Sequence, residues 1–313
     1  MLVSVVIICM NNLRNLYPCL NSLRKYTSIS YEVLVVTYLF SEENLRKLKK
    51  DYPWITIIES DEIRGFSENN NLALARAKGK YCFVLNDDTE IKMPVIDELV
   101  KTIENLPQNV GIVSPVTIYP NGKVQVCGRP PKNWIKFLLQ TFHFWDENKG
   151  DYVNKTGVFK SYNIIGAAFL IKTELFKKFG WFDETYFFCP EDIALSTLLN
   201  KNGYYCYVNS DVKVVHYEGM SGKSLSMVQV ATRPSACRGS IIFYADGSII
   251  KQMILSVVLF FVYCFRFLIH RMAGIIKKRP NMDYILSIGD LNCIKTCFSR
   301  KTPKEIFKKY YKA

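Results

Sequence analysis

An acid and amide cluster, Asn86-Asp87-Asp88, directly follows the apolar run from Tyr81 to Leu85. Carboxylate and amide oxygens are hard ligands of the kind that Mg²⁺ and Mn²⁺ prefer, and these ions commonly keep part of their coordination sphere for phosphate oxygens. Asn and Asp are also frequent in turns and helix caps, which is the alternative interpretation. The cluster therefore predicts either a divalent-metal site that receives a phosphate or a simple turn.

His216 ends another apolar run, Val212 to Val215. A neutral imidazole is a competent Mn²⁺ ligand and can share a coordination sphere with carboxylates. A single histidine at the end of a strand is more often structural, but the chain has only three histidines, so few other imidazole ligands exist. His216 is the candidate nitrogen ligand.

Glu191 and Asp192 follow the aromatic segment from Tyr186 to Pro190. A carboxylate held among apolar and aromatic side chains becomes a stronger proton acceptor, which suits a general base. Two carboxylates at the start of a helix are also stabilised by the helix dipole without any further role. The residues alone leave both interpretations open.

The segment from Gly65 to Asn71 begins with glycine and continues with polar side chains. Backbone amides at such a helix start can approach a phosphate or a nucleobase. Glycine-led helix starts are common, so this feature is weak by itself. It is not a P-loop, because it lacks the Gly-Lys-Ser/Thr ending at a strand-to-helix turn.

Regular elements are required to bring these groups together. Apolar runs predict buried strands at 3–9, 32–37, 55–59 and 81–85, with helices between them. The last of these helices is expected to run from Ser67 to about Ala77, and Pro94 is expected in the first turn of a further helix. Alternating strands and helices indicate βαβ units and a parallel sheet covered on both faces. Ligands of such sheets collect outside the carboxyl ends of the strands, and Asn86 to Thr89 lies at one of these ends.

The pattern after Val113 is mixed. Strands are predicted at 123–127, 164–171, 204–208 and 212–215, and short helices at 173–179 and 191–202. Ten cysteines without a C-x-x-C pair suggest free thiols in a reducing cytoplasm.

The net charge of +13 is concentrated near the C-terminus, where Arg266 to Ala313 holds twelve Lys and Arg against three Asp and Glu. Such a region suits acidic lipid or nucleic acid, or is simply solvated. The basic residues flank an apolar run instead of interleaving with aromatic side chains on a sheet, so we predict no nucleic-acid partner.

The apolar run extends from Met253 to Phe265 and resumes at 267–269. Its length is marginal for a membrane span, which needs about 20 apolar residues. We predict a helix that lies in the interface of an anionic membrane, with a spanning helix and a buried core helix as alternatives. The neighbouring basic residues, which favour the cytoplasmic side, are Arg266, Arg271, Lys277, Lys278 and Arg279.

Taken in order, these segments resemble the family 2 glycosyltransferases, especially bacterial rhamnosyltransferase-like members. The resemblance covers roughly residues 3 to 225, and each of its segments is weak alone. The seven segments are Val3–Ile8, Gly65–Asn71, Leu85–Thr89, Gly166–Leu170, Gly180–Glu184, Phe188–Asp192 and Val214–His216.

The resemblance implies a GT-A fold, a Rossmann-like and mainly parallel sheet flanked by helices, and an inverting transfer from a nucleotide sugar with Mn²⁺ or Mg²⁺. Asp88 would be the principal metal ligand, with Asn86 in support and His216 as a third ligand. Asp192 would take the acceptor proton, and Glu191 would orient the acceptor. The implied donor-binding residues are Thr37, Gly65, Phe66, Asn71, Asn86, Asp87 and Asp88.

Two positions depart from the family pattern. Thr37 stands where members usually carry an acid that reads the nucleobase, and Asn86 replaces the first acid of the metal motif. These departures keep open a catalytically impaired, glycosyltransferase-like module that binds a glycan or a partner protein. A nucleotidyltransferase is disfavoured, because Met10 to Arg14 is not a glycine-rich basic loop.

The expected organisation is a catalytic domain at 1–228 and a helical, basic, membrane-associated region at 229–313. Within the former, 1–115 would bind the nucleotide sugar and 116–228 the acceptor. The expected partners are a nucleotide-sugar donor, a glycan or lipid-linked acceptor, and an anionic membrane surface. The expected setting is cell-surface polysaccharide synthesis at the cytoplasmic face of the membrane, as a peripheral or monotopic protein.

Overall fold

The computed structural model describes residues 1–147, 152, 154–217, 226–276 and 280–311, so the predicted tail residues Lys277, Lys278 and Arg279 lie outside the described part. The chain forms two compact units. The first, the sheet unit, comprises 1–131, 146–183 and 191–221. The second, the helical unit, comprises 132–145, 184–190 and 222–313.

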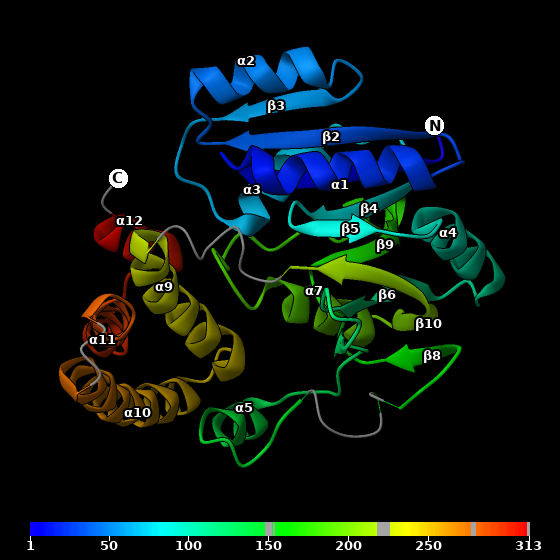
Figure 1. Ribbon diagram of the computed structural model, residues 1–313. Coiled ribbons are helices and arrows are strands. Elements are labelled where there is room, and N and C mark those ends of the chain that lie inside the picture. Colours follow the sequence, from blue (N-terminus) through cyan, green and yellow to red (C-terminus); the bar gives the residue numbers. More distant parts are fainter. Residues whose placement is uncertain (148–151, 153, 218–225, 277–279, 312–313) are drawn as a thin grey trace. The chain divides into compact units, whose positions relative to one another are not determined.

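The sheet unit begins with four parallel strands, as the sequence predicts (Figure 1). They are β1 Val3–Met10, β2 Tyr31–Tyr38, β3 Thr56–Ser60 and β4 Tyr81–Asn86. The helices between them are α1 Leu13–Tyr26, α2 Glu42–Asp51 and α3 Phe66–Leu74. Ser41 caps α2, its side chain accepting a hydrogen bond from the Asn44 amide at 3.3 Å.

The second half of this unit adds strands of both directions. They are β5 Thr89–Ile91, β6 Val110–Ile118, β7 Val124–Val126, β8 Val158–Ser161, β9 Ala168–Lys172 and β10 Tyr205–His216. Along the main path of the described sheet the order is β3-β2-β1-β4-β9-β6-β10-β5, with β7 paired to β6 and β8 to β10. Because β9, β5, β7 and β8 run antiparallel to their neighbours, the sheet is mixed.

Helices cover both faces of the sheet, and alternate residues of each strand supply the two apolar layers. In β1, Val5 and Ile7 face the layer that contains α1 and α4 Val95–Asn105, whereas Val6 faces the layer that contains α3. The second layer also includes α6 Thr173–Lys178 and α7 Glu191–Lys201. This is the covered α/β sheet that the apolar runs predict.

Several boundaries differ from the sequence-based prediction. The helix expected to run to Ala77 ends at Leu74, and Pro94 caps α4 instead of occupying its first turn. The strands expected at 204–208 and 212–215 are one strand, β10, because a register shift between Asn209 and Lys213 accommodates the intervening residues without ending it.

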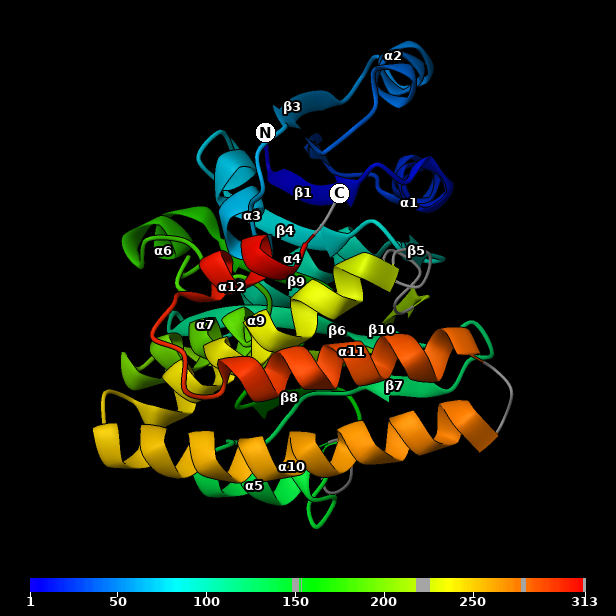
Figure 2. The same cartoon turned by 90° about the vertical axis from the view of Figure 1, so that its left-hand side faces the viewer.

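The helical unit contains α5 Trp134–Thr141, α9 Ser226–Ala245, α10 Ile249–Ile276, α11 Pro280–Thr296 and α12 Pro303–Tyr310. Its core is formed by side chains such as Ile241, Leu259 and Cys293. Figure 2 shows α10 and α11 lying side by side along most of their length. All ten cysteines are free thiols, as predicted.

The apolar run forms a longer helix than the sequence suggests. Helix α10 has 28 residues, and among the described residues it is the one helix long and apolar enough to cross a membrane. Only 17% of its most apolar window is buried inside the structure, which contradicts the buried-core alternative. The prediction of marginal length was wrong because the helix continues through Arg266 to Ile276.

Candidate active site

Asp88 lies in the tight turn that joins β4 to β5. The Thr89 hydroxyl donates a hydrogen bond to the Asn86 carbonyl at 2.7 Å, which closes the turn. The amide of Tyr217 donates to the Asp88 carbonyl at 2.9 Å and ties the turn to the end of β10. The backbone of Asp88 is thus fixed from two sides.

His216 reaches Asp88 through strand pairing. Antiparallel pairing of β5 with β10 sets Thr89 opposite His216, and His216 Nε2 lies 3.3 Å from Asp88 Oδ1. Both side chains are buried. The structure therefore brings together Asp88 and His216, two of the three predicted metal ligands, which are far apart in the sequence.

Gln125 is a member of this cluster that the sequence analysis missed. Its Oε1 accepts a hydrogen bond from His216 Nδ1 at 2.8 Å, so the ring carries its hydrogen on Nδ1 and turns Nε2 toward Asp88. Gln125 lies in the three-residue strand β7. No local pattern marks a glutamine there as a partner of a distant histidine.

The pair fits a divalent cation on chemical grounds. An imidazole that donates from Nδ1 to Gln125 can offer the Nε2 lone pair to a cation, and Asp88 Oδ1 lies 3.3 Å from His216 Nε2. Two acceptors so close need a proton or a cation between them, and neighbouring ligands of octahedral Mg²⁺ are about 3 Å apart. Within the described part of the chain, no group of three or more His, Cys, Asp or Glu could hold a metal, so protein and substrate oxygens would complete the sphere.

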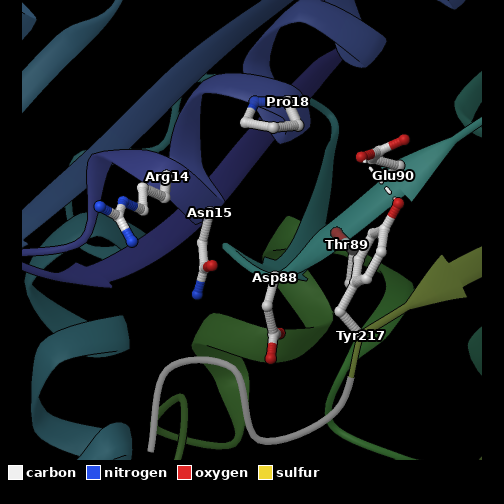
Figure 3. Close-up of a pocket in the computed structure, with 7 residues that line it drawn as sticks. All are labelled: Arg14, Asn15, Pro18, Asp88, Thr89, Glu90 and Tyr217. Carbon is white, nitrogen blue, oxygen red and sulfur yellow. Dashed lines mark hydrogen bonds between the residues drawn. The ribbon is translucent and has the colours of Figure 1, made fainter. Parts of the chain in front are cut away.

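A pocket of about 190 Å³ opens beside Asp88, and its lining includes Arg14, Asn15 and Tyr217. Figure 3 shows the Asn15 and Asp88 side chains extending in the same direction, from α1 and from the end of β4. Tyr217 is held by a 3.0 Å hydrogen bond from its hydroxyl to Glu90. The exposed Arg14 and the N-terminal end of α1 make the margin of this pocket favourable for an anion.

The remaining residues of the acid and amide cluster face different surroundings. The Asn86 amide donates to the Ala167 carbonyl at 2.9 Å, and its carbonyl accepts from Thr89, so its backbone anchors the end of β4. Asp87 is buried close to Cys9. Burial raises the pKa of the Cys9 thiol, and the Asp87 carboxylate raises it further.

Asp192 lies in the first turn of α7, where its Oδ2 accepts a hydrogen bond from the Gly166 amide at 3.1 Å. Since Ala167 contacts Asn86, neighbouring residues of one segment touch both Asp192 and the end of β4. A Cβ at Gly166 would lie 3.4 Å from Asp192 Cβ, an ordinary contact distance, so the Gly166 backbone packs directly against Asp192. Glu191 is buried in the same turn.

Arg129 and Glu147 also belong to the surroundings of Asp192, and the sequence analysis missed both. Arg129 Nη1 lies 3.7 Å from Asp192 Oδ2, and Arg129 Nε lies 3.9 Å from Glu147 Oε1. All three side chains are mostly shielded from solvent. The aromatic residues expected beside Asp192 pack within the helical unit instead, where Tyr186 contacts Phe243 and Phe187 contacts Phe307.

The other predicted donor-binding residues make mainly structural contacts. Thr37 is 1% exposed, and its hydroxyl donates to the Ile58 carbonyl at 3.4 Å. The Asn71 side chain bonds both backbone groups of Phe182, at 2.9 and 3.1 Å. Gly65 caps α3 and donates to Glu68, while Phe66 packs on Phe182. A donor-binding role for these four residues stays a prediction.

The chain belongs to glycosyl transferase family 2, because the model of that family matches residues 4–180, more than half of the sequence. A curated relative, the O-antigen biosynthesis protein RfbC of Myxococcus xanthus, is 25% identical over 204 residues, which are 62% of this chain. The chain spans only 15% of that protein's length.

Solved structures share the fold. A mannosyltransferase from Pyrobaculum calidifontis in complex with GDP-Man and Mn²⁺ is 15% identical with a TM-score of 0.54, covering 93% of this chain and 86% of its own. GalNAc-T7 with UDP, GalNAc and Mn²⁺ is 18% identical with a TM-score of 0.57, and the match covers 69% of this chain and 44% of the GalNAc-T7 chain. S. aureus TarS with UDP-GlcNAc is 18% identical with a TM-score of 0.50, and the match covers 96% of this chain and 82% of the TarS chain. The predicted family and GT-A fold are confirmed.

Proposed function

We propose that this chain transfers a sugar from a nucleotide-sugar donor to a hydroxyl of a glycan or lipid-linked acceptor during synthesis of a cell-surface polysaccharide. Family membership supports the reaction class, and the printed name of the Myxococcus xanthus relative supports the setting. The observation that carries the proposal is the buried Asp88–His216 pair beside a pocket at the carboxyl ends of β1 and β4.

A divalent cation, Mn²⁺ or Mg²⁺, is part of this proposal. Asp88 and His216 would hold it, and Asn86 is the predicted supporting ligand. Mixed nitrogen and oxygen ligation suits Mn²⁺, and two of the structural neighbours were solved with Mn²⁺. When bound, the cation neutralises negative charge on the diphosphate leaving group.

Arg14 is proposed to bind the diphosphate of the donor. Its guanidinium lines the pocket that contains Asp88, and it lies in the first turn of α1, where the helix dipole favours an anion. A planar guanidinium is suited to paired phosphate oxygens. Asp87 and the segment from Gly65 to Asn71 remain the predicted contacts to the rest of the donor.

The transfer is proposed to invert the anomeric carbon, with Asp192 as the base. The acceptor hydroxyl loses its proton to Asp192 while its oxygen forms the new bond to the anomeric carbon. The bond from that carbon to the diphosphate breaks on the opposite face, and the nucleoside diphosphate leaves with the electron pair. Glu191 is proposed to orient the acceptor. Residues 1–115 would bind the donor and 116–228 the acceptor.

The site of action is proposed to be the cytoplasmic face of the membrane. Helix α10 presents a largely unburied apolar surface, and nucleotide sugars and positively charged flanks favour the cytoplasmic side. An interfacial helix that holds the protein on the membrane explains both features. Residues 229–313 would then be the membrane-associated region.

The experiment that tests the proposal is a panel of nucleotide sugars in a thermal unfolding assay, with Mn²⁺ and with chelator. A ligand that binds only the folded state raises the melting temperature. At a ligand concentration about one hundred times the dissociation constant, the free energy of unfolding increases by about 2.7 kcal/mol. We expect one donor class to stabilise the protein with Mn²⁺ only. Arg14→Gln should weaken that stabilisation, while Arg46→Gln, on exposed α2, should not. No stabilisation by any donor would contradict the proposal.

A further inference from the structure

The outward face of α10 is an apolar stripe. Its large side chains recur every three or four residues, which places them on one side of the helix. Phe265 is 65% exposed and Ile275 is 76% exposed. The exposed members of this stripe are Ile250, Met253, Ile254, Val257, Phe261, Phe265, Leu268, Ile269, Met272 and Ile275. A helix of this length carries the stripe over about 38 Å.

A pocket of about 250 Å³ lies at the C-terminal end of this stripe. It is lined by four residues of α10, His270, Arg271, Gly274 and Ile275, and by Tyr284 of α11. Ile275 belongs to both the stripe and the pocket, so an apolar surface and a partly polar recess adjoin each other. Figure 2 shows helices α10 and α11 side by side. Residues of both helices line the pocket.

Of the described charged side chains around the pocket, Arg271 remains as an unneutralised positive charge at the rim. The fully buried Asp290 is paired inside the unit, with Arg233 Nη2 at 2.6 Å and with His270 Nδ1 at 2.5 Å. Arg271 is exposed and lies over the Tyr284 ring at 5.3 Å. No ion pair of Arg271 occurs among the residues that the structure describes, so its guanidinium edge is available to an anion.

We propose that this pocket binds the phosphate headgroup of an anionic lipid whose acyl chains lie along the α10 stripe. The proposal rests on the membrane association proposed above and names the lipid chemistry that it uses. Stacking on Tyr284 holds the Arg271 guanidinium flat, and its donors match phosphate oxygens. His270 also lines the pocket, with its Nδ1 engaged by Asp290, so a protonated ring would donate from Nε2 to a phosphate oxygen.

A lipid explains the surface better than a second copy of this chain. Helix α10 contains no Asp or Glu, so a second copy packed stripe to stripe would bring no acidic residue of α10 to the positive charges of Arg266 and Arg271. An anionic bilayer complements these charges, because acidic headgroups attract basic residues near the membrane surface. Charge complementarity therefore selects the lipid.

The pocket also has room for substitutions that test it. A Cβ at Gly274 would contact Asp283 Cβ at 3.7 Å, an ordinary packing distance, so Gly274→Leu should fold while filling the recess. Asp283 sets a carboxylate near Gly274, which opposes an anion. We expect Asp283→Asn to strengthen lipid binding a few-fold.

The test is flotation of the full chain with vesicles of phosphatidylcholine alone, or mixed with phosphatidic acid. We expect Arg271→Gln and Gly274→Leu to weaken binding to phosphatidic acid vesicles about tenfold. The affinity of Arg271→Lys for phosphatidic acid vesicles should lie between that of Arg271→Gln and that of the unchanged protein. Lysine keeps the positive charge but loses the paired donors of the guanidinium group. The matched control is Arg300→Gln, which removes an exposed arginine outside the pocket and should cost less than about fivefold.

Each outcome distinguishes the two proposals. Equal losses in Arg271→Gln and Arg300→Gln would overturn the headgroup site while leaving membrane association in place. No binding of the unchanged chain to any vesicle would overturn membrane association itself. Inorganic phosphate that competes at equal affinity would identify a free-anion site instead, and sedimentation as a dimer that Phe265→Glu dissociates would assign the stripe to a second copy.

Discussion

In the sheet unit, Asp88 and His216 are buried at the ends of strands, whereas α10 of the helical unit turns Phe261 and Phe265 outward. Each arrangement reverses the ordinary distribution of polar and apolar side chains. Buried polar groups are stable only with partners: Gln125 is a partner of His216, and the proposed cation would bridge Asp88 and His216. A large exposed apolar surface usually has a partner outside the chain. Both units thus depart from the ordinary distribution at the places where we propose that they bind a ligand.

The largest expected effect comes from Asp88. Asp88→Ala removes the carboxylate of the proposed metal pair, and we expect sugar transfer to fall by about a thousandfold or more, on the order of 4 kcal/mol in the barrier. Donor binding should weaken in Mn²⁺ and change little in chelator, as measured by isothermal titration. Asp61→Ala, an exposed aspartate, is the control. Equal weakening in both conditions would argue against the metal.

Asp192→Asn should slow transfer by roughly 100- to 10,000-fold, because the amide cannot take the acceptor proton. The side chain keeps an oxygen for the Gly166 amide, so the fold and the metal-dependent binding of donor should persist. Turnover with the donor and acceptor at saturation is the measurement. A variant that turns over at the normal rate would remove Asp192 as the base.

Stability measurements sharpen the contrast within α10 itself. Leu259→Ala removes a buried side chain from the core of the helical unit, and we expect it to lower the free energy of unfolding by about 2 to 5 kcal/mol. Phe265→Ala changes an exposed position of the same helix and should cost less than about 0.5 kcal/mol in solution. Urea denaturation gives both values. A large loss for Phe265→Ala without lipid would mean that its ring is packed in the protein.

The smallest effects compare the units directly through their helix caps. Ser41 caps α2 in the sheet unit, and Thr302 caps α12 in the helical unit. Replacing either residue by Ala should lower the free energy of unfolding by about 1 kcal/mol, because the helix loses its capping hydrogen bond. If the two cores unfold separately, calorimetry will resolve two transitions and each variant will lower only one. Identical shifts of a single transition would show that the units unfold together.

Much of the first sheet half follows from local sequence. Strands β1 to β4 lie within one or two residues of the predicted runs, because continuous β-branched stretches suit a strand buried on both faces. Strand β7 lies inside the strand predicted at 123–127, whereas β5 was not predicted, since so short a run has no periodicity. Their position depends on pairing with β10 and β6.

The candidate site divides in the same way. Residue chemistry selected the Asn86–Asp88 cluster, the Glu191–Asp192 pair and His216, and the family resemblance singled out Asp88 and Asp192. The structure brings Asp88 and His216 together. The same reasoning missed Gln125, Arg14 and Arg129, whose surroundings consist of residues distant in sequence. It also assigned Asn71 to the donor, whereas its amide bonds the Phe182 backbone.

The sequence by itself determined which segments become strands and helices and which side chains end the strands, because apolar periodicity and capping act over a few residues. Only the tertiary structure decided that His216 lies beside Asp88 and that Phe265 has no cover within its own unit. Those facts depend on the order of strands in the sheet and on the side of α10 that packs on α11. Both are set by contacts between residues that are far apart along the chain.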